Sequence, residues 1–378
     1  MCPSRVGELT SPLSLYIHVP FCAAKCGYCS FYSRPPRGGE MEAWLGAVER
    51  EARLWRERAE GKIPLRTLYA GGGTPSLLPL PLWRRLLSLV EENFDLSPLE
   101  EATAEANPSS LTGDLLHLWE ASFLTRVSLG VQSLDDAELR VLGRLHDAEG
   151  ALRVMQQVAG SRLALSADLI FGLPGQTLRS WAASLHKALD AGAPHLSTYQ
   201  LTLEPDTPMG CAGPELPDGY PFYRYAQWFL PRGGLVQYEV SNFARPGSEC
   251  RHNLAYWRQE NVLALGPAAW GYLDGWRYAN PRTLEAYLGA APGDLGNAER
   301  LDTLARAVEC AILALRTRWG IDREDFAARW GIGLLREVEG VMSGLPPRLL
   351  RDDGHSLSLT PAGMRVGNAV WTELMGLC

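Results

Sequence analysis

The stretch Leu15-Tyr-Ile-His-Val-Pro-Phe-Cys22-Ala-Ala-Lys-Cys26-Gly-Tyr-Cys29 decides the fold of this chain. Residues 15–19 are rich in β-branched and aromatic side chains, which predicts a buried strand ending at Pro20. Three cysteines follow in a short loop with the spacing Cys-x3-Cys-x2-Cys. A cubane iron–sulfur cluster normally takes four thiolates, so three would leave one iron open to a small molecule. The alternatives are a zinc site that lacks its fourth ligand and three unrelated buried thiols.

The composition is that of an ordinary globular protein, long enough for one large domain and a smaller one. The chain has 378 residues, of which 46% are hydrophobic and 21% are charged. Lys and Arg number 36 against 43 Asp and Glu, which gives a net charge of −7. An acidic chain without a basic tract argues against a nucleic-acid partner.

The sequence predicts neither a membrane span nor a secretory signal. The longest stretch without a charged residue, 9–24, is too short to cross a bilayer and contains Pro12 and Pro20. Residues 1–10 lack the apolar segment of a signal peptide. Eight cysteines in 378 residues are too sparse for a disulfide scaffold. We therefore expect a cytoplasmic protein without a transmembrane segment; peripheral contact with a membrane would leave no mark in the sequence.

Six successive strand–helix units are predicted, and such units require a parallel sheet because each helix returns the chain to the same edge. A doubly wound sheet is one alternative, but the first glycine-rich turn lacks the pattern G-x-G-x-x-G. Polar residues after several different strands favour a barrel, whose chemistry lies at the carboxyl ends of its strands. Six units instead of eight predict a partial, open barrel. The expected strands are 15–19, 66–70, 102–106, 126–132, 163–171 and 195–203.

Candidate site residues stand at these strand ends. The run Gly71 to Gly73 either lets the backbone approach a ligand closely or simply forms a turn. Glu105 ends the third strand and Gln132 ends the fourth. Asp168 lies within an apolar strand, where a carboxylate must be paired or bound. Arg144, expected on a helix, is either the counter-charge of a ligand carboxylate or a solvated side chain.

In combination, these motifs resemble the HemN/HemW family of radical S-adenosylmethionine (SAM) proteins. That family contains oxygen-independent coproporphyrinogen III dehydrogenases and HemW heme chaperones, and the cysteine spacing is the mark of radical SAM enzymes. The resemblance covers essentially the whole chain. The matching stretches are Tyr-Ile-His-Val-Pro-Phe-Cys at 16–22, Gly-Gly-Gly-Thr-Pro-Ser at 71–76, Glu-Ala-Asn-Pro at 105–108, Ser-Leu-Gly-Val-Gln-Ser at 128–133, Leu-Gly-Arg-Leu-His at 142–146 and Asp-Leu-Ile-Phe-Gly-Leu-Pro-Gly-Gln-Thr at 168–177.

The resemblance implies a partial (β/α)6 radical SAM barrel that holds a [4Fe-4S] cluster on Cys22, Cys26 and Cys29. SAM would bind the open iron, and the reduced cluster would pass an electron to the sulfonium and release a 5′-deoxyadenosyl radical. The residues implied to contact this SAM are Tyr16, Gly72, Gly73, Thr74 and Glu105, and those implied to face a second SAM, or the equivalent space, are Gln132, Arg144 and Asp168.

Two features favour the HemW branch. The dehydrogenases carry a fourth cysteine two residues after the third, where this chain has Phe31, and a longer extension than the 21 residues that precede Cys22. The segments 238–246, 250–257 and 266–270 also resemble the HemW branch. The implied function is a heme chaperone that delivers heme to recipient hemoproteins. The alternative is an enzyme that decarboxylates coproporphyrinogen III oxidatively with SAM.

The last third is expected to extend the barrel. His252 is either an axial heme ligand or a histidine that satisfies buried backbone groups. Three helices, a hairpin at the turn Asp352-Asp-Gly354 and a final helix over 361–377 predict a winged-helix-like module, with a protein-docking role favoured over DNA binding. The expected fold class is therefore α/β with a C-terminal α+β extension. The expected divisions are 12–215 for the barrel, 216–300 for a linker and extension, and 301–378 for the module.

Overall fold

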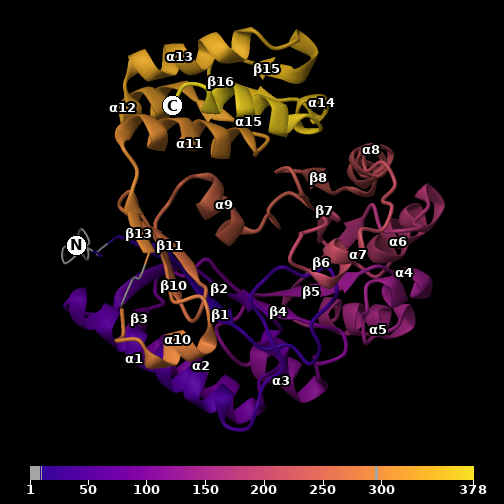
Figure 1. The fold of residues 1–378 in the computed structure, drawn as a ribbon, viewed down its shortest axis with the longest axis vertical. Helices are drawn as coiled ribbons and strands as arrows, with labels where there is room; N and C mark the ends of the chain where they lie inside the picture. The colour runs from indigo at the N-terminus through magenta and orange to yellow at the C-terminus, as the bar shows by residue number, and fades with distance from the viewer. Residues whose placement is uncertain (1–8, 10, 294–296) are drawn as a thin grey trace.

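A 13-stranded sheet organises most of the chain, and a small module with its own core follows it (Figure 1). The computed structural model describes residue 9 and residues 11–293 and 297–378. The N-terminal segment searched for a secretory signal therefore lies almost wholly outside the described residues. The strand order is β13-β12-β11-β10-β1-β2-β4-β5-β6-β7-β9-β8, and the short β3 (Phe94–Asp95) pairs with β2 off this path.

Seven neighbouring strands, from β10 to β7, run parallel and form the open barrel. All six predicted strands are present, and the predicted partial barrel is confirmed. The seventh strand, β10, pairs with β1 and was not predicted. The bounds are β1 (Leu13–Val19), β2 (Ile63–Gly72), β4 (Glu101–Ala106), β5 (Arg126–Gln132), β6 (Ala164–Phe171), β7 (His195–Gln200) and β10 (Val262–Leu265).

Helices cover the outer face of the barrel and leave the inner face free for a site (Figure 1). Their apolar faces bury large side chains against the sheet; Trp44 and Trp55 of the first helix are both fully buried. The bounds are α1 (Glu40–Arg58), η1 (Pro75–Leu77), α2 (Leu80–Asn93), α3 (Gly113–Glu120), α4 (Asp136–Val141), α5 (Ala148–Ala159) and α6 (Leu178–Asp190).

Residues 216–300 add antiparallel strands to both edges of the parallel sheet and share its core. Two short strands, β8 (Val236–Gln237) and β9 (Asn242–Ala244), lie beside β7. The strands beyond β10 are β11 (Trp270–Leu273), β12 (Trp276–Ala279) and β13 (Asn297–Arg300), and the helices are α8 (Tyr220–Phe229), η2 (Leu230–Gly233), α9 (Arg251–Trp257) and α10 (Leu284–Gly289). The short helix α7 (Pro208–Ala212) precedes this segment.

The C-terminal module has the predicted three helices followed by a hairpin, and a short strand that was not predicted, β14, lies between its first two helices. Its core forms a cluster separate from that of the barrel. The final helix, expected over 361–377, is broken into two. The bounds are α11 (Thr303–Leu315), β14 (Ile321–Asp322), α12 (Arg323–Trp330), α13 (Ile332–Ser343), η3 (Pro347–Leu349), β15 (Leu350–Asp352), β16 (Ser356–Leu359), α14 (Pro361–Met364) and α15 (Gly367–Met375).

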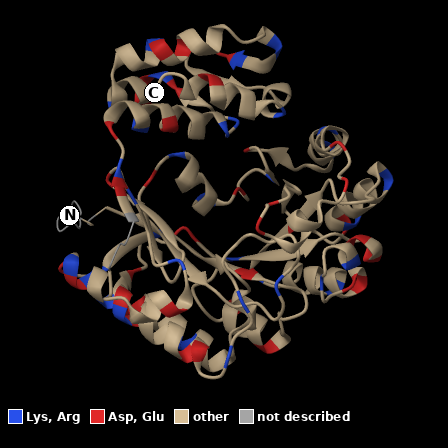
Figure 2. Ribbon diagram, viewed as in Figure 1, with Lys and Arg blue, Asp and Glu red and all other residues tan. Residues whose placement is uncertain are grey.

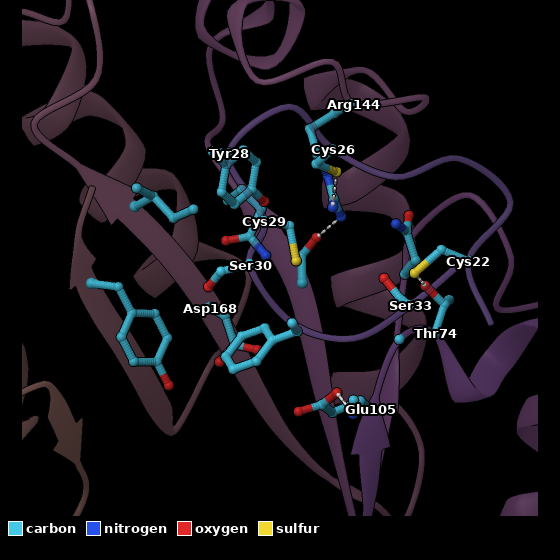
Figure 3. A pocket seen from close by; sticks show the side chains of 18 of the residues that line it. Cys22, Cys26, Tyr28, Cys29, Ser30, Ser33, Thr74, Glu105, Arg144 and Asp168 are labelled. Atoms are coloured by element: carbon cyan, nitrogen blue, oxygen red, sulfur yellow. Dashed lines mark hydrogen bonds between the residues drawn. The ribbon is translucent and has the colours of Figure 1, made fainter. Parts of the chain in front are cut away.

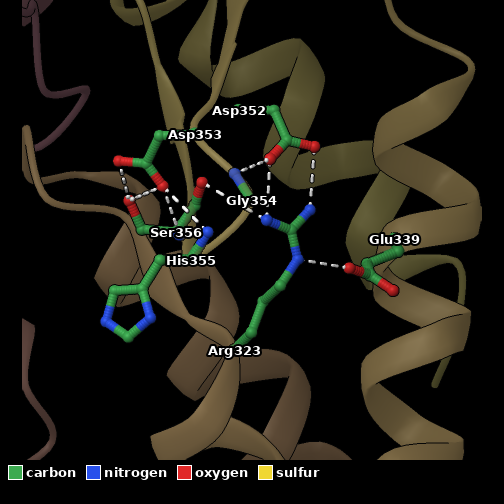
Figure 4. Close-up of polar contacts among 7 residues, drawn as sticks. All are labelled: Arg323, Glu339, Asp352, Asp353, Gly354, His355 and Ser356. Carbon is green, nitrogen blue, oxygen red and sulfur yellow. Dashed lines mark hydrogen bonds and ion pairs between the residues drawn. The ribbon is translucent and has the colours of Figure 1, made fainter.

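Arg323 fixes the hairpin of this module to its helices (Figure 4). Its guanidinium donates to both carboxylate oxygens of Asp352, at 2.7 and 2.9 Å, and to Glu339 Oε1 at 2.7 Å. The Arg323 guanidinium lowers the pKa of Asp352 to about 2. Gly354 takes a positive φ of 83° in the predicted turn, so the hairpin ends where the sequence places it.

Charged residues of both signs alternate along the outer helices and the C-terminal module (Figure 2). Within the described part of the chain, no helix combines the length and apolar character needed to cross a membrane.

A buried carboxylate, Glu51, ties α1 to the far edge of the barrel. It accepts hydrogen bonds from Gly266 N at 3.1 Å, Asn280 Nδ2 at 2.8 Å and Tyr287 Oη at 2.6 Å. Burial raises the pKa of Glu51 from an ordinary value of 4.5 to about 7, although the three donors oppose that shift.

This raised pKa predicts a pH-dependent stability. Between about pH 4.5 and 7 the native state holds the Glu51 proton and the unfolded state releases it. The free energy of unfolding should therefore fall as the pH rises through this window, by up to about 3 kcal/mol. Denaturant unfolding at pH 5.5, 6.5 and 7.5 measures the slope, which should be shallower for Glu51→Gln. Equal slopes for both proteins would assign the pH dependence to other groups.

Candidate functional site

The three cysteines lie on one loop at the carboxyl end of β1. The loop is closed by hydrogen bonds from Cys22 N to Arg34 O at 3.0 Å and from Arg34 N to Pro20 O at 2.9 Å. All three thiols are partly exposed, and they line one cavity of about 450 Å³, called here the cluster cavity (Figure 3). The predicted strand–loop therefore brings Cys22, Cys26 and Cys29 together at the mouth of the barrel.

Two of the sulfur atoms have polar neighbours from other parts of the chain, one after β2 and one after α4. Thr74 Oγ1 donates to Cys22 Sγ at 3.4 Å, and Arg144 Nη1 donates to Cys26 Sγ at 3.5 Å (Figure 3). A hydroxyl donor and a cation stabilise negative charge on sulfur. Burial, in contrast, raises the pKa of the Cys29 thiol. Three thiols with few compensating neighbours suit a bound group that is itself positively charged and so stabilises the thiolates.

The thiols fit a cluster better than a single ion. Among the described residues, no three His, Cys, Asp or Glu side chains converge closely enough to hold one metal ion. Thiolates of a cubane need not converge in this way, because each binds a different iron. Cys22, Cys26 and Cys29 can therefore hold a [4Fe-4S] cluster, which would leave the fourth iron facing the cluster cavity.

The glycine run at the end of β2 has a packing role in addition to the predicted ligand role. Gly73 N donates to Val19 O at 2.8 Å, and a Cβ atom on Gly73 would lie 2.6 Å from Phe21 O. Gly72 has a φ of +107°, and a Cβ atom there would lie 2.4 Å from the His18 ring. Side chains at these positions would push β2 away from the cysteine loop. Gly72 and Gly73 also line the cluster cavity, which leaves the ligand role as a prediction.

Glu105 lies in the cluster cavity at the end of β4 (Figure 3). It accepts hydrogen bonds from Tyr69 Oη at 2.8 Å and from Gly72 N at 3.0 Å. Burial raises the pKa of Glu105 to about 7, and nearby Asp168 adds to the effect. A cationic or hydroxyl-bearing ligand would restore the charge-assisted contacts that a buried carboxylate needs.

Gln132, Arg144 and Asp168 line the same cavity. Asp168 accepts hydrogen bonds from Ser128 Oγ at 3.1 and 3.2 Å, and burial raises the pKa of its carboxyl. Gln132 ends β5 with a φ of +67°. Arg144 lies in the turn after α4 and not on a helix as expected, and its Nη2 donates to Gly130 O at 2.6 Å. The turn lets the guanidinium reach Cys26.

Tyr16 lies on β1 beside the site. Its hydroxyl is 3.0 Å from His18 Nδ1, and its ring stacks on Tyr69 with centroids 6.3 Å apart. Tyr16 is not among the residues that line the cluster cavity. Its contact with SAM stays a prediction.

His252 lies on α9, between two aromatic rings and away from the cysteines. Its ring stacks on Tyr69 at 5.2 Å and meets Tyr256 edge-on at 5.4 Å, and its Nδ1 is 2.8 Å from Thr67 Oγ1. The side chain is 1% exposed, and burial lowers its pKa to about 3. Its Nε2 has no partner among the described residues. A heme iron would reach this nitrogen only if the rings moved, and the ligand role stays a prediction.

Sequence reasoning missed several residues that line the cluster cavity. Tyr69 lies two residues before Gly71 on the same face of β2, which is a signal that strand alternation contains. Tyr199 lies at the end of β7, where the strand-end rule would have placed it. The further side chains missed include Tyr28, Ser33, Asn107, Ser128 and Gln200.

Comparison with known proteins supports this description. Residues 16–188 match the family model of the radical SAM superfamily, and residues 301–366 match the HemN C-terminal domain. A protein of Lactococcus lactis named heme chaperone HemW is 33% identical, over 97% of this chain and 98% of its own length. An Escherichia coli protein of the same name is 37% identical, over 69% and 70%.

A solved structure shares the fold. Coproporphyrinogen III oxidase (HemN) from Escherichia coli, described as a radical SAM enzyme, matches with a TM-score of 0.85 over 98% of this chain and 91% of that chain. The sequences are 21% identical, so this similarity concerns the fold alone.

The open parallel barrel and the three-cysteine loop at its mouth together define a radical SAM protein. Within the radical SAM proteins, the family is shown by the sequence identity of 33% between this chain and the Lactococcus lactis protein over nearly the whole length of both. The chain belongs to the HemN/HemW family, within its HemW branch.

Proposed function

We propose that this protein is a heme chaperone that holds a [4Fe-4S] cluster and SAM and delivers heme to hemoproteins. The observation that carries the proposal is Phe31, which occupies the position of the fourth motif cysteine of the dehydrogenases. Its ring is 68% exposed and lines the cluster cavity. The names of the relatives from Lactococcus lactis and Escherichia coli support the same proposal.

The chain's own residues would divide the work at the cluster cavity. Cys22, Cys26 and Cys29 would bind the cluster, which when bound supplies an electron to the SAM sulfonium. Glu105 would accept hydrogen bonds from the amino group or a ribose hydroxyl of SAM, beside Gly72, Gly73, Thr74 and Tyr16. The residues proposed to face a second ligand space are Gln132, Arg144 and Asp168.

The binding partners and the cellular compartment follow from the same proposal. The partners would be heme and recipient hemoproteins in the cytoplasm, with residues 301–378 as a docking module. The mixed charges of that module support a protein partner over nucleic acid (Figure 2).

The experiment that tests the function is heme transfer. Ferric heme added to the purified full chain should stay bound through gel filtration and then pass to an apo-globin, as followed by the Soret absorption. His252→Ala in the same assay tests the predicted ligand separately. Heme lost entirely on the column from the wild-type protein would contradict the proposal.

SAM binding has its own test at Glu105. We expect Glu105→Gln to weaken SAM binding about tenfold or more, because it removes the charge from a charge-assisted contact. Iron and sulfide content should stay unchanged, since Glu105 touches none of the cysteines. The control is Glu100→Gln, a surface change at the other end of the same strand. Equal affinities in calorimetric titration of the two variants would remove Glu105 from the SAM site.

A further inference from the structure

A second cavity, of about 620 Å³, lies at the open side of the barrel, and we call it the lateral cavity. One wall comes from the end of β7 and from β9, and the opposite wall comes from β11 and β12. Helix α9 lies between these walls, beneath α11 of the C-terminal module (Figure 1). The unclosed sheet therefore leaves a chamber that two helices cover.

The lateral cavity has aromatic walls. Tyr256 and Trp257 come from α9, and Trp270 and Tyr272 come from β11. Trp270 and Tyr272 are two residues apart, so they share one face of the strand. Trp270 is 60% exposed, which leaves a large apolar ring without a covering partner in the described part of the chain. Such walls suit a flat, largely apolar ligand.

The same chamber contains buried polar atoms without partners. Asn242 is 3% exposed and Gln259 is 7% exposed, yet Asn242 Oδ1 and Gln259 Oε1 bond to nothing among the described residues. Trp257 Nε1 and Arg316 Nε are likewise buried and unpartnered in the described part of the chain. Each such atom is costly unless a ligand or water satisfies it. These four atoms have almost no accessible surface, so they lie within the chamber walls and do not by themselves select a ligand.

Arg316 is the free cation of this chamber within the described residues. Its guanidinium is held between the rings of Trp257, at 4.8 Å, and Trp371, at 4.2 Å. No ion pair or side-chain hydrogen bond engages it in the described part of the chain. A stacked guanidinium is fixed in orientation and presents a planar fork that fits a carboxylate.

The acidic residues of the chamber do not occupy Arg316. Glu309 is paired with Arg277, and Glu260 is paired with Arg66 at 3.2 Å. Glu239 interacts electrostatically with Arg316 without forming a hydrogen-bonded ion pair; it is 1% exposed and accepts a hydrogen bond from Ser241 N at 3.0 Å. Burial raises its pKa to about 7, so part of its charge is absent at neutral pH.

We infer that the lateral cavity binds a flat aromatic ligand through a carboxylate, with Arg316 as its anion-binding residue and Trp270 as a stacking wall. Taking this ligand to be heme, which is flat and carries two propionates, rests on the proposed function. Heme in the lateral cavity would then lie beside the cluster cavity, since Tyr199 lines both chambers.

The test compares two probes on the full-length chain: ferric protoporphyrin IX and its dimethyl ester, whose carboxylates are blocked. We expect the acid to bind about tenfold or more tightly than the ester, as for one charge-assisted hydrogen bond. Arg316→Gln should remove that preference, and Trp270→Ala should weaken both probes several-fold. Arg318→Gln is the control, because Arg318 stacks on Trp319 outside the lateral cavity.

The outcomes separate this inference from the proposed function. If the wild-type protein binds both probes equally, the carboxylate contact is wrong, even if Arg316→Gln fails to fold. If the acid binds Arg316→Gln and Trp270→Ala as tightly as wild type, heme binds elsewhere and the chaperone proposal stands. If the wild-type protein binds neither probe, the proposed function fails, and the inference fails with it.

Discussion

We expect Cys26→Ala to abolish the visible absorption of the anaerobically reconstituted protein and to lower its iron content from about four atoms per chain to near zero. This is the largest effect that we expect from any single change. Cys26 is the central cysteine of the loop, and its sulfur is the one that Arg144 contacts at 3.5 Å. Two thiolates on a short loop would leave two irons of a cubane open to solvent. Cys22→Ala and Cys29→Ala should have the same effect.

The matched controls are cysteines outside the loop. Cys310 is buried in the core of the C-terminal module, so Cys310→Ala should keep full cluster content. Cys211 is the more demanding control, because α7 contacts the loop through a hydrogen bond from Met209 N to Gly27 O at 2.8 Å. Loss of the cluster in Cys211→Ala would make that thiol a fourth ligand. Full cluster content in Cys26→Ala would refute the assignment of this loop as the cluster site.

We expect coproporphyrinogen III to remain unchanged when the reconstituted protein is incubated with it, SAM and a reductant, and we expect the same preparation to pass heme to an apo-globin. Phe31 provides the reason, because it replaces the fourth motif cysteine of the dehydrogenases with a ring that is 68% exposed. Radical chemistry needs a cavity closed to water and side reactants. The exposed Phe31 ring indicates a cavity that is open to solvent, and an open cavity suits a protein that must release its ligand again.

The readouts for this prediction are porphyrin fluorescence after oxidation and the release of deoxyadenosine. The control is Phe31→Cys, which restores the dehydrogenase spacing and should leave the substrate unchanged as well, because one cysteine does not close the cavity. Formation of protoporphyrinogen IX coupled to deoxyadenosine by the wild-type protein would move it to the dehydrogenase branch.

The parts of the fold that repeat along the chain could be predicted from the sequence. Each parallel strand of the barrel has its own apolar run and its own following helix, so local patterns sufficed. β10 has only the four residues Val262–Leu265 and pairs with β1, which lies far away in the sequence. Its place in the sheet therefore has no local sequence signal. Arg144 was expected on a helix because Asp135 begins one, and that helix ends at Val141. Nothing local marks this early end except Gly143, with its φ of +67°.

The cluster cavity was predictable because its residues come from motifs at strand ends. The lateral cavity was not, because its walls come from separate segments that only the tertiary fold brings together. Arg316 and Trp257 are separated by 59 positions in the sequence, and the guanidinium of one stacks on the ring of the other. The sequence also could not show that His252 is packed between Tyr69 and Tyr256. A sequence motif specifies which residues are present and does not specify how deeply a side chain is buried.

Tyr199 lines both cavities, so the binding of ligands in the two chambers would be thermodynamically linked if each ligand contacted this ring. A ligand on one side restricts the positions of this ring and so changes the free energy of filling the other side. Such coupling is reciprocal: the factor by which SAM changes the affinity for heme equals the factor by which heme changes the affinity for SAM. Exchange of SAM would then tune the retention of heme without any contact between the two molecules.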